Sequence, residues 1–289
     1  MKVPPQARAL PDGRLHLQHG PIDLILGVSA DPAAKAAAFR AATVRFATVL
    51  DELCAELAGL RAPAGLDVPP LHGPVARRMA AAVRPYVAHC FITPMAAMAG
   101  AVADEMLAAV TAGAPLRRAY VNNGGDIALH LSPGERFRIG MVDRPDRPGL
   151  FGAAEVRAGE PIRGLATSGW RGRSFSLGIA DAVTVLAATA AEADAAATVI
   201  ANAVDLPGHS AIHRTPASEL QPDSDLRGRR VTTAVEALTP GEIGRALDGG
   251  ARVAGRLLRE GLIAAAAMHC QGTTRVAGAP VLAREAAYA

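Results

Sequence analysis

The start of the chain changes from a strand pattern to a helix pattern. Residues 14–17 and 22–28 are alternating or continuous apolar segments separated by a Gly-Pro pair, which predicts a β-hairpin. An Asp-Pro pair then precedes a long stretch with apolar residues at helical spacing. Because aspartate caps helix starts and proline fits the first helical turn, this stretch predicts a helix over residues 33–57.

Two more helices are predicted before the middle of the chain. A Gly-Pro pair opens residues 75–84, and Thr93 with Pro94 opens a segment that runs to Leu107. In that segment methionine and valine recur at spacings of three and four residues, and the residues between them are mostly alanine and glycine. A helix with such small side chains allows another backbone or a ligand to come close.

The rest of the chain mixes strands and helices. Thr239 and Glu242 have the spacing of a capping box, which predicts a helix start there. Residues 207–230 are rich in Pro, His, Ser and Arg and predict a long loop. The predicted strands are residues 119–121, 127–131, 136–142, two within 154–166, 182–188 and 263–268, and the further predicted helices are residues 190–204 and 240–257.

Composition argues against a nucleic-acid partner. Half of the residues are hydrophobic and 3% are aromatic, so the core is built from Ala, Val, Leu and Ile, with few rings left to stack on bases. The 30 basic and 27 acidic residues give a net charge of +3, which is too balanced to indicate a polyanionic partner. We therefore expect no nucleic-acid partner.

We also expect a soluble, cytoplasmic protein with no membrane partner. The N-terminus lacks a charged leader followed by an apolar stretch, and no run of about 18 apolar residues is free of helix breakers. Cys54, Cys90 and Cys270 are far apart and form no C-x-x-C pair, so they predict neither a disulfide framework nor a zinc site. Their neighbours His89 and His269 are interpreted as ordinary core residues.

A cluster of amide, glycine and carboxylate residues lies near the middle of the chain, at Val121-Asn122-Asn123-Gly124-Gly125-Asp126-Ile127. Two adjacent glycines allow positive φ and leave no Cβ in the way of a ligand, while Asn and Asp place polar groups around that gap. Asn-Gly between apolar strands is also the strongest short signal for a tight hairpin. These residues alone favour the hairpin, and a binding loop gains support only from the other polar clusters.

A second cluster is Ala166-Thr167-Ser168-Gly169-Trp170-Arg171-Gly172-Arg173, which contains the single tryptophan of the chain. Backbone N–H groups beside Ser, Thr and Arg form a natural anion cradle. A polar hairpin loop would have the same composition, so the composition favours neither the anion cradle nor the hairpin loop. Trp170 either offers a flat apolar face and an N–H donor to a ring-shaped ligand or fills the core beneath the loop.

Asp194 and Thr198 form a third pair of interest. They are four residues apart in a predicted helix, so they share one helix face. Carboxylate and hydroxyl oxygens are hard ligands of the kind that Mg²⁺ takes, with phosphates and waters completing its shell. A surface aspartate and a threonine bonded to its own helix would have the same spacing, so the pair alone does not define a site.

Taken in order along residues 90–205, these clusters resemble the ApbE superfamily, whose best-known members are FAD:protein FMN transferases. The likeness is greatest to an uncharacterised, cytoplasmic ApbE-like branch. No single motif is very specific, but their order along the chain is. The matching segments are Met98-Ala99-Gly100-Ala101-Val102-Ala103-Asp104, residues 121–127, Phe137-Arg138-Ile139-Gly140-Met141, residues 162–169, Val183-Thr184-Val185 and residues 193–198.

The resemblance implies an α+β fold of antiparallel sheets packed with helices, which we expect to form one domain over residues 1–289. It also implies a cleft for Mg²⁺ and FAD or another nucleotide, with Asp194 and Thr198 at the metal positions of the family. The partner is then a small phosphate-bearing cofactor, and a homo-oligomer is not excluded. The expected cofactor-binding residues are Asn122, Asn123, Gly124, Gly125, Asp126, Thr167, Ser168, Gly169, Trp170 and Arg171.

The chain departs from the transferases in two places. They carry a lysine before the glycine of the first motif, where this chain has Ala99, and its only lysines are Lys2 and Lys35. They also carry a His-Ile-Ile-Asp-Pro-x-Thr-Gly segment, where residues 174–181 are shorter and lack the His, Pro and Thr.

Two classes of function are therefore predicted side by side. The first is a Mg²⁺-dependent transferase or hydrolase that acts on a flavin nucleotide or another phosphate-bearing cofactor. Its candidate catalytic groups are Asp104, Asp126 and Arg171. The second is a non-catalytic nucleotide- or cofactor-binding protein that has lost the flavin-transferase chemistry.

Overall fold

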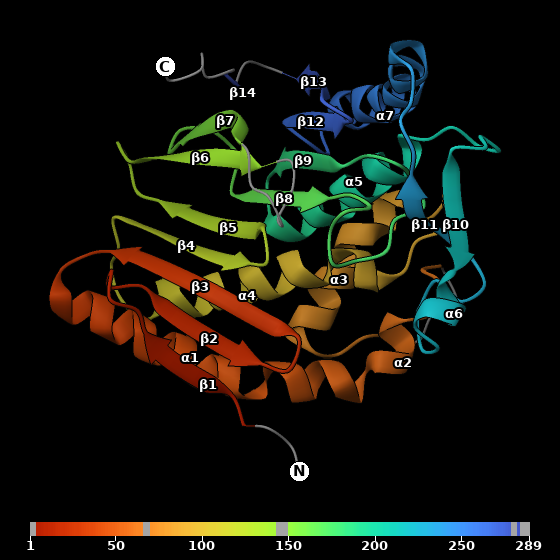
Figure 1. Cartoon of the computed structure of the whole chain (residues 1–289). Helices are drawn as coiled ribbons and strands as arrows, with labels where there is room; N and C mark the ends of the chain where they lie inside the picture. The colour runs from red at the N-terminus through yellow and green to blue at the C-terminus, as the bar shows by residue number, and fades with distance from the viewer. Residues whose placement is uncertain (1–3, 66–69, 143–149, 279–281, 284–289) are drawn as a thin grey trace. The chain divides into compact units, whose positions relative to one another are not determined.

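The computed structural model describes residues 4–65, 70–142, 150–278 and 282–283 (Figure 1). The chain divides into two compact units, and each unit combines antiparallel strands with helices. The predicted α+β class is therefore confirmed. The first unit consists of Met1–Arg136, Arg157–Ala166 and Ala188–Asp194, and the second of Phe137–Val156, Thr167–Ala187 and Ala195–Ala289.

An antiparallel sheet forms the centre of the first unit. The predicted N-terminal hairpin is confirmed, because Leu15 pairs with Leu26 and His19 with Ile22 across it. Buried residues alternate with more exposed ones along this hairpin, as expected for a sheet with one covered face. The strands are β1 (Gln6–Ala9), β2 (Leu15–His19), β3 (Ile22–Ser29), β4 (Arg118–Asn123), β5 (Asp126–Leu131) and the first residues of β8 (Gly164–Ser168).

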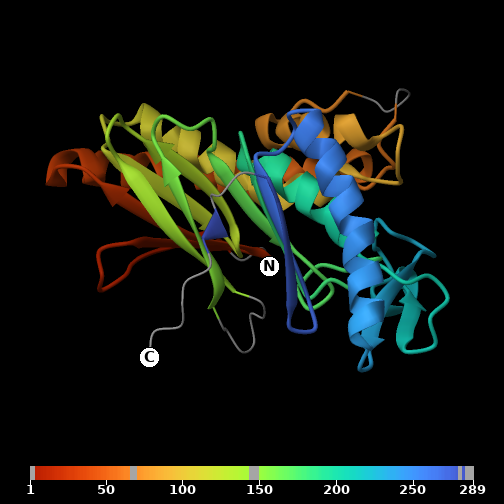
Figure 2. The ribbon, with the colours of Figure 1, turned by 90° about the horizontal axis from the view of Figure 1, so that it is seen from above.

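Helices cover one face of this sheet, as Figure 2 shows. The two long ones, α1 (Pro32–Ala55) and α4 (Met98–Ala112), pack against each other and against the strands. The predicted start of α1 is confirmed, because Asp31 accepts the backbone N–H of Ala34 at 2.9 Å. The shorter elements of the unit are α2 (Leu57–Leu60), α3 (Pro74–Val83) and the 3₁₀ turns η1 (Arg84–Tyr86) and η2 (Pro94–Ala97).

The α-helix predicted from Thr93 and Pro94 begins four residues later than expected, at Met98. The reason is a long-range contact. The N–H of Gly100, in the first turn of α4, bonds to the carboxylate of Asp194, which lies 94 residues further along the chain. The segment Pro94–Ala112 is the one described helical stretch long and apolar enough to span a membrane, but α4 packs against α1, β4 and β5 as a core helix.

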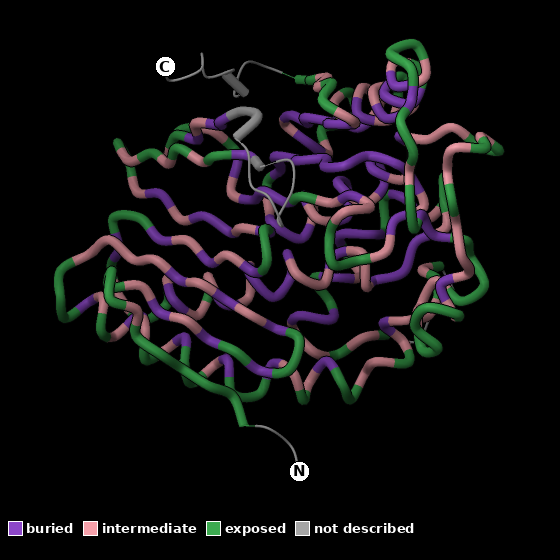
Figure 3. The backbone as a smooth tube through the Cα atoms, viewed as in Figure 1, coloured by how far each residue is buried: buried purple, intermediate pink, exposed green. Residues whose placement is uncertain are grey.

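The second unit is built around three antiparallel strands, β9 (Ala182–Ala187), β12 (Ala265–Cys270) and β13 (Thr273–Gly278). Every residue of β9 and β12 is buried, and Figure 3 shows both strands in purple along their length. Helix α7 (Pro240–Arg259) packs on β12 and β13. Its predicted capping box is confirmed, because Thr239 and Glu242 make both reciprocal bonds. His269 and Cys270 are buried, which confirms their interpretation as core residues. The same interpretation is wrong for His89 and Cys90, which are both exposed.

The long loop predicted over residues 207–230 is wrong in part, because it contains β10 (Ile212–Pro216) and α6 (Ala217–Leu220). Strand β10 pairs with β11 (Arg230–Val235) and has no fully buried residue, so it lacks the alternating pattern that identifies strands. A separate small sheet contains β6 (Arg136–Val142), β7 (Leu150–Arg157) and β14 (Leu282–Ala283), and helix α5 (Ala190–Ala203) begins in the first unit and continues in the second.

Candidate functional site

The Asn-Asn-Gly-Gly-Asp cluster is a tight hairpin turn in the first unit. Asn123 pairs with Asp126, so Gly124 and Gly125 form a two-residue loop between β4 and β5. Both glycines have positive φ, +65° and +116°, and a Cβ at Gly125 would meet nothing within 4 Å. The side chain of Asn122 accepts the Gly125 N–H at 2.9 Å and closes the turn. The hairpin is confirmed, and the glycine backbone beside Asp126 is open.

This turn is tied to the start of α4. Asn123 Nδ2 donates to the carbonyl oxygen of Ala99 at 3.0 Å, across 24 residues of chain. Asn123 is only 3% exposed, and Asp126 is buried as well at 9%. Because a buried amide without a partner would cost free energy, this bond fixes the turn against the helix start. Two of the predicted binding residues are therefore held at the N-terminal end of α4.

Asp194 contacts the same end of α4. Its Oδ2 accepts the N–H of Gly100 at 3.0 Å. The pKa of Asp194 is raised well above its ordinary value, first by burial and next by the negative charge of Asp126. Within the described residues, no Lys, Arg or His forms an ion pair with Asp194. Such a group of carboxylates matches a site for a bound cation, because a cation would favour their charged forms.

Asp104, on α4, caps the start of α5. Its Oδ1 accepts the Ala190 N–H at 3.0 Å and its Oδ2 accepts the Ala191 N–H at 2.9 Å. Burial raises the pKa of Asp104 to about 6, although these two bonds act in the opposite direction. The helices α4 and α5 thus exchange capping carboxylates, since Asp194 in turn bonds the first turn of α4.

Two glycines, one on α4 and one on β8, let these elements approach the start of α5 closely. A Cβ at Gly100 would lie 2.2 Å from the carbonyl oxygen of Ala190, and a Cβ at Gly164 in β8 would lie 2.0 Å from the carbonyl carbon of Thr189. Both distances are far below van der Waals contact, so any side chain at either position would force the backbones apart. Small residues on α4 were predicted to allow a backbone or a ligand to come close. At Gly100 the neighbour is the backbone of α5.

The Ala-Thr-Ser-Gly loop lies in the second unit, at the end of β8. A Cβ at Gly169 would lie 2.4 Å from the carbonyl oxygen of Asp181, so this position requires glycine. Trp170 is half-buried, and its indole Nε1 is buried and has no hydrogen-bond partner among the residues that the structure describes. The guanidinium carbon of Arg171 lies 4.4 Å from the centre of the indole ring. One face of the tryptophan is therefore already covered by a side chain.

Arg171 is itself held by a buried carboxylate. Its Nε donates to Asp181 Oδ1 at 2.6 Å, and the backbone N–H of Gln271 donates to Asp181 Oδ2 at 2.6 Å. The sequence analysis did not single out Asp181. The sequence does contain one indication of its role. Asp181 directly precedes the fully buried strand β9, and a polar residue at such a place needs hydrogen-bond partners.

The remaining predicted residues lie on β8 and α5. The hydroxyl oxygens of Thr167 and Thr184 are 2.9 Å apart, and Ser168 is half-buried at the end of β8. Thr198 is half-buried four residues after Asp194, so helix geometry places both side chains on one face of α5. The structure gathers Asn123, Asp126, Asp104 and Asp194 near the start of α4. That residues 121–127 and 166–171 face one cleft stays a prediction.

The donor set at the start of α4 fits a hard cation bound together with a ligand. Within the described part of the chain, no three His, Cys, Asp or Glu side chains form a metal-binding cluster. A Mg²⁺ ion held by Asp194 and Thr198 would therefore take its other oxygens from water and from a phosphate group. Asp194 has a like-charged neighbour in Asp126, and a bound cation would offset that repulsion, which makes Asp194 the central residue of the candidate site.

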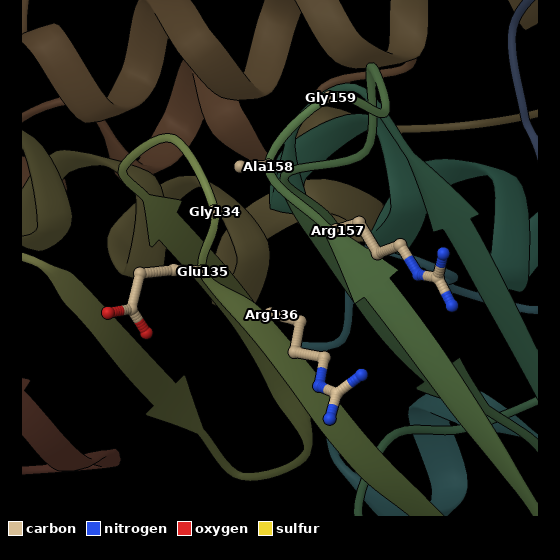
Figure 4. Close-up of a pocket in the computed structure, with 6 residues that line it drawn as sticks. All are labelled: Gly134, Glu135, Arg136, Arg157, Ala158 and Gly159. Atoms are coloured by element: carbon tan, nitrogen blue, oxygen red, sulfur yellow. The ribbon is translucent and has the colours of Figure 1, made fainter.

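A cavity of about 460 Å³ lies elsewhere in the first unit (Figure 4). Figure 4 shows the side chains of Arg136 and Arg157 extending to one side and that of Glu135 to the other. No residue predicted as a site from the sequence lines this cavity, so it does not mark the candidate site. Its lining residues are Gly134, Glu135, Arg136, Arg157, Ala158 and Gly159.

Similar proteins fall into two groups. Curated relatives include a UPF0280 protein of Methanosphaerula palustris, 37% identical over 147 residues, which are 47% of this chain and 55% of the relative. Another, from Methanopyrus kandleri, is 39% identical over 129 residues, covering 44% of this chain and 48% of the relative. The chain thus spans about half the length of the curated relatives it matches. The names of these relatives state no activity.

A solved structure, the apo form of Pseudomonas stutzeri flavinyl transferase ApbE, matches over 96% of both chains with a TM-score of 0.44 and 11% identity. That likeness is too low to transfer residues or activity. The family model described as "AbpE bacteria" matches residues 7–276, which is nearly the whole chain. The chain therefore belongs to the AbpE bacteria family, and the ApbE-like resemblance of its motifs is confirmed.

Proposed function

We propose that the protein binds Mg²⁺ with a phosphate-bearing cofactor of the flavin-nucleotide class at the start of α4, and that it is a Mg²⁺-assisted transferase or hydrolase. The observation that carries the proposal is Asp194, whose pKa is raised by burial and then by Asp126, and which has no ion-pair partner among the described residues. A carboxylate that has like-charged neighbours and no ion-pair partner is suited to a bound cation. Family membership suggests the flavin nucleotide.

The roles of the residues follow from their contacts. Asp194 and Thr198 would supply side-chain oxygens to Mg²⁺, which supplies charge neutralisation on a pyrophosphate when bound. Asn123 holds the β4–β5 turn on the backbone of α4. Gly125 presents open backbone where a ligand can approach, because a Cβ at this position would meet nothing within 4 Å.

A non-catalytic cofactor-binding protein is the second candidate, and one observation favours it. Ala99 stands where the transferases carry a lysine, and its carbonyl oxygen accepts a bond from Asn123. Lys2 and Lys35 are the only lysines of the chain, so none follows this motif. A protein of this class would keep the cation and cofactor site and lack turnover.

Incubation of the purified protein with FAD and Mg²⁺, followed by chromatography for FMN and AMP, separates the candidates. A hydrolase should release both FMN and AMP, because water takes up the FMN. A transferase should release AMP and leave the FMN on an acceptor, and Asp194→Ala should abolish AMP release in either case. The matched control is Glu192→Gln, which removes a negative charge from the same helix two residues away. Binding of FAD without products supports the second candidate. If the protein neither binds FAD nor forms products, both candidate functions are contradicted.

A further inference from the structure

We propose that Asp104 is a positioning residue, which fixes the first turn of α5 and thereby sets the place of the Asp194 carboxylate. This inference rests on the proposed function for the role of Asp194 as a cation ligand. In this inference Asp104 does not contact the cofactor. The role differs from the sequence-based prediction, in which Asp104 is a candidate catalytic group.

The N–H groups of the first three residues of α5 each have an acceptor outside the helix ladder, and Asp104 supplies two of the three. An α-helix leaves its first four N–H groups without partners inside the helix. Ala190 and Ala191 donate to the two oxygens of Asp104 at 3.0 and 2.9 Å. Glu192 donates to Thr189 Oγ1 at 3.2 Å and Ala193 to Thr189 O at 3.1 Å. Asp194 is the next residue, so its backbone follows directly from this capped turn.

The carboxylate of Asp104 suits this position because both of its oxygens are used. Two successive N–H groups at a helix start point in nearly the same direction, and a carboxylate accepts one on each oxygen. An alanine at position 104 would leave both N–H groups without these acceptors, and an asparagine would offer one carbonyl oxygen in place of two. The cap therefore fixes the orientation of the first turn of α5 as well as satisfying its donors.

The surrounding backbone leaves little room for this turn to take another position. Gly100 faces the carbonyl of Ala190, and Gly164 faces the carbonyl of Thr189, both closer than a Cβ would allow. A first turn that moved to find new partners for its N–H groups would move against α4. Because Asp194 bonds the N–H of Gly100 at that same place, its carboxylate would be displaced relative to α4.

The hydrogen bonds between α4 and α5 are reciprocal. Asp104 follows Gly100 by one helical turn on α4 and holds the start of α5. Asp194 follows the start of α5 by one turn and holds Gly100. Each carboxylate thus fixes the helix that carries the other. A cap with a purely structural role would stabilise α5 without affecting the bond between Asp194 and Gly100, and this difference can be measured.

Amide hydrogen exchange in the full-length protein, well below its melting temperature, tests these reciprocal hydrogen bonds without any metal. Asp104→Ala should speed exchange about tenfold at Ala190 and Ala191 and also at Gly100, and Asp104→Asn should have a smaller effect. The matched control is Glu105→Gln, because the neighbouring Glu105 pairs with Arg45 at 2.9 Å and Arg78 at 3.2 Å and does not cap α5. It should leave all three amides unchanged.

Loss of protection at Ala190 and Ala191 with an unchanged Gly100 amide would overturn the proposal, because the cap would then act on α5 alone. An unchanged rate at all three amides would overturn it as well. If Asp104→Ala unfolds at the temperature used, Asp104→Asn decides between the same outcomes.

Binding of Mn²⁺ in the presence of FAD, followed by electron paramagnetic resonance, separates this inference from the proposed function. Asp104→Ala should weaken Mn²⁺ binding about tenfold, the scale typical for residues that orient metal ligands, and Glu105→Gln should not. If Asp194→Ala loses Mn²⁺ and Asp104→Ala keeps it, the inference fails and the proposed function stands. If Asp194→Ala binds Mn²⁺ like the native protein, the proposed function fails, and the exchange rate of Gly100 still decides the positioning role.

Discussion

Two aspartates, one in each unit, have opposite surroundings. Asp181 in the second unit is 8% exposed, and its two oxygens accept bonds from Arg171 and from the Gln271 N–H, each at 2.6 Å. Asp194 in the first unit accepts the N–H of Gly100 and has other carboxylates as charged neighbours, so its pKa is raised by burial and then by Asp126. The carboxylate is paired with an arginine in the second unit, whereas in the first unit it has no ion-pair partner among the described residues.

This difference separates a structural carboxylate from a functional one. A buried anion that the protein neutralises contributes to the fold, and its removal leaves partners without an acceptor. A buried anion among like charges destabilises the protein unless something else binds it, and such groups concentrate at functional sites. The comparison therefore assigns Asp181 to the architecture of its loop, and it supports the ligand-binding role that we propose for Asp194.

The largest expected effect is on stability, and it differs between the two aspartates. Asp181→Ala leaves Arg171 and the Gln271 N–H without an acceptor, so the free energy of unfolding should fall by about 3 to 4 kcal/mol at pH 7. Asp194→Ala leaves the Gly100 N–H without its acceptor but also removes a carboxylate that has like-charged neighbours. Because these two effects offset each other, the free energy of unfolding should change by less than about 1 kcal/mol. Urea unfolding measures both variants, and equal losses would contradict the comparison.

The pH dependence of stability should show the raised pKa values of the carboxylates in the first unit directly. The pKa of Asp104 is raised to about 6 in the folded state, mainly by burial, so the folded protein holds its proton more tightly than the unfolded chain. Its contribution is present below the ordinary pKa of an aspartate and is lost as the pH rises through about 6. The loss amounts to no more than about 3 kcal/mol.

Urea unfolding of the native protein and of Asp104→Asn at pH 4, 5, 6 and 7 measures this contribution. The decline between pH 4 and pH 6 should be smaller in the variant, whose side chain does not titrate. Identical slopes for the two proteins would show that Asp104 does not titrate in this window. Asp194, whose pKa is also raised, should add a decline that persists in Asp104→Asn.

A smaller loss is expected when the two helix starts are forced apart. In Gly100→Ala, the added Cβ would lie 2.2 Å from the Ala190 carbonyl oxygen, and the overpacking should lower the free energy of unfolding by about 2 kcal/mol. Gly244→Ala is the matched control, because a Cβ at this position on α7 meets nothing within 4 Å. The control should gain up to about 1 kcal/mol from its better helix propensity. Thermal unfolding followed by circular dichroism compares the two, and a gain in Gly100→Ala would contradict the contact.

The smallest effect concerns Trp170, which can report on ligand binding in the second unit. Arg171 already covers one face of the ring, so stacking of a flavin should contribute only about 1 kcal/mol, at the low end for a base on an aromatic. The emission of this single tryptophan should shift as FAD is added, and Trp170→Phe should weaken FAD binding slightly. Emission that does not respond to FAD would remove Trp170 from the site and leave it a packing role.

Features encoded by a few neighbouring residues could be predicted from the sequence. The N-terminal hairpin, the Asp31 cap of α1 and the Thr239–Glu242 capping box follow local rules, and each is present. The Asn-Asn-Gly-Gly-Asp turn is also local, because its geometry follows from two residues with positive φ.

Features that depend on distant segments could not be predicted. The delayed start of α4 and the cap of α5 join residues 94, 86 and 87 positions apart, and nothing near Gly100 or Ala190 indicates their partners. Strand β10 was missed because its pairing with β11 leaves it half-exposed. The sequence therefore identified Asp104 and Asp194 as residues of interest, and only the fold shows that each one caps the helix of the other.

Calorimetric titration of Mg²⁺ into the protein in the presence of FAD tests the central claim most directly. The account predicts saturable binding that is weak without FAD, lost in Asp194→Ala and retained in the control Glu192→Gln, because the cation depends on the Asp194 carboxylate and on phosphate oxygens. Equal Mg²⁺ binding by the native protein and Asp194→Ala would contradict it.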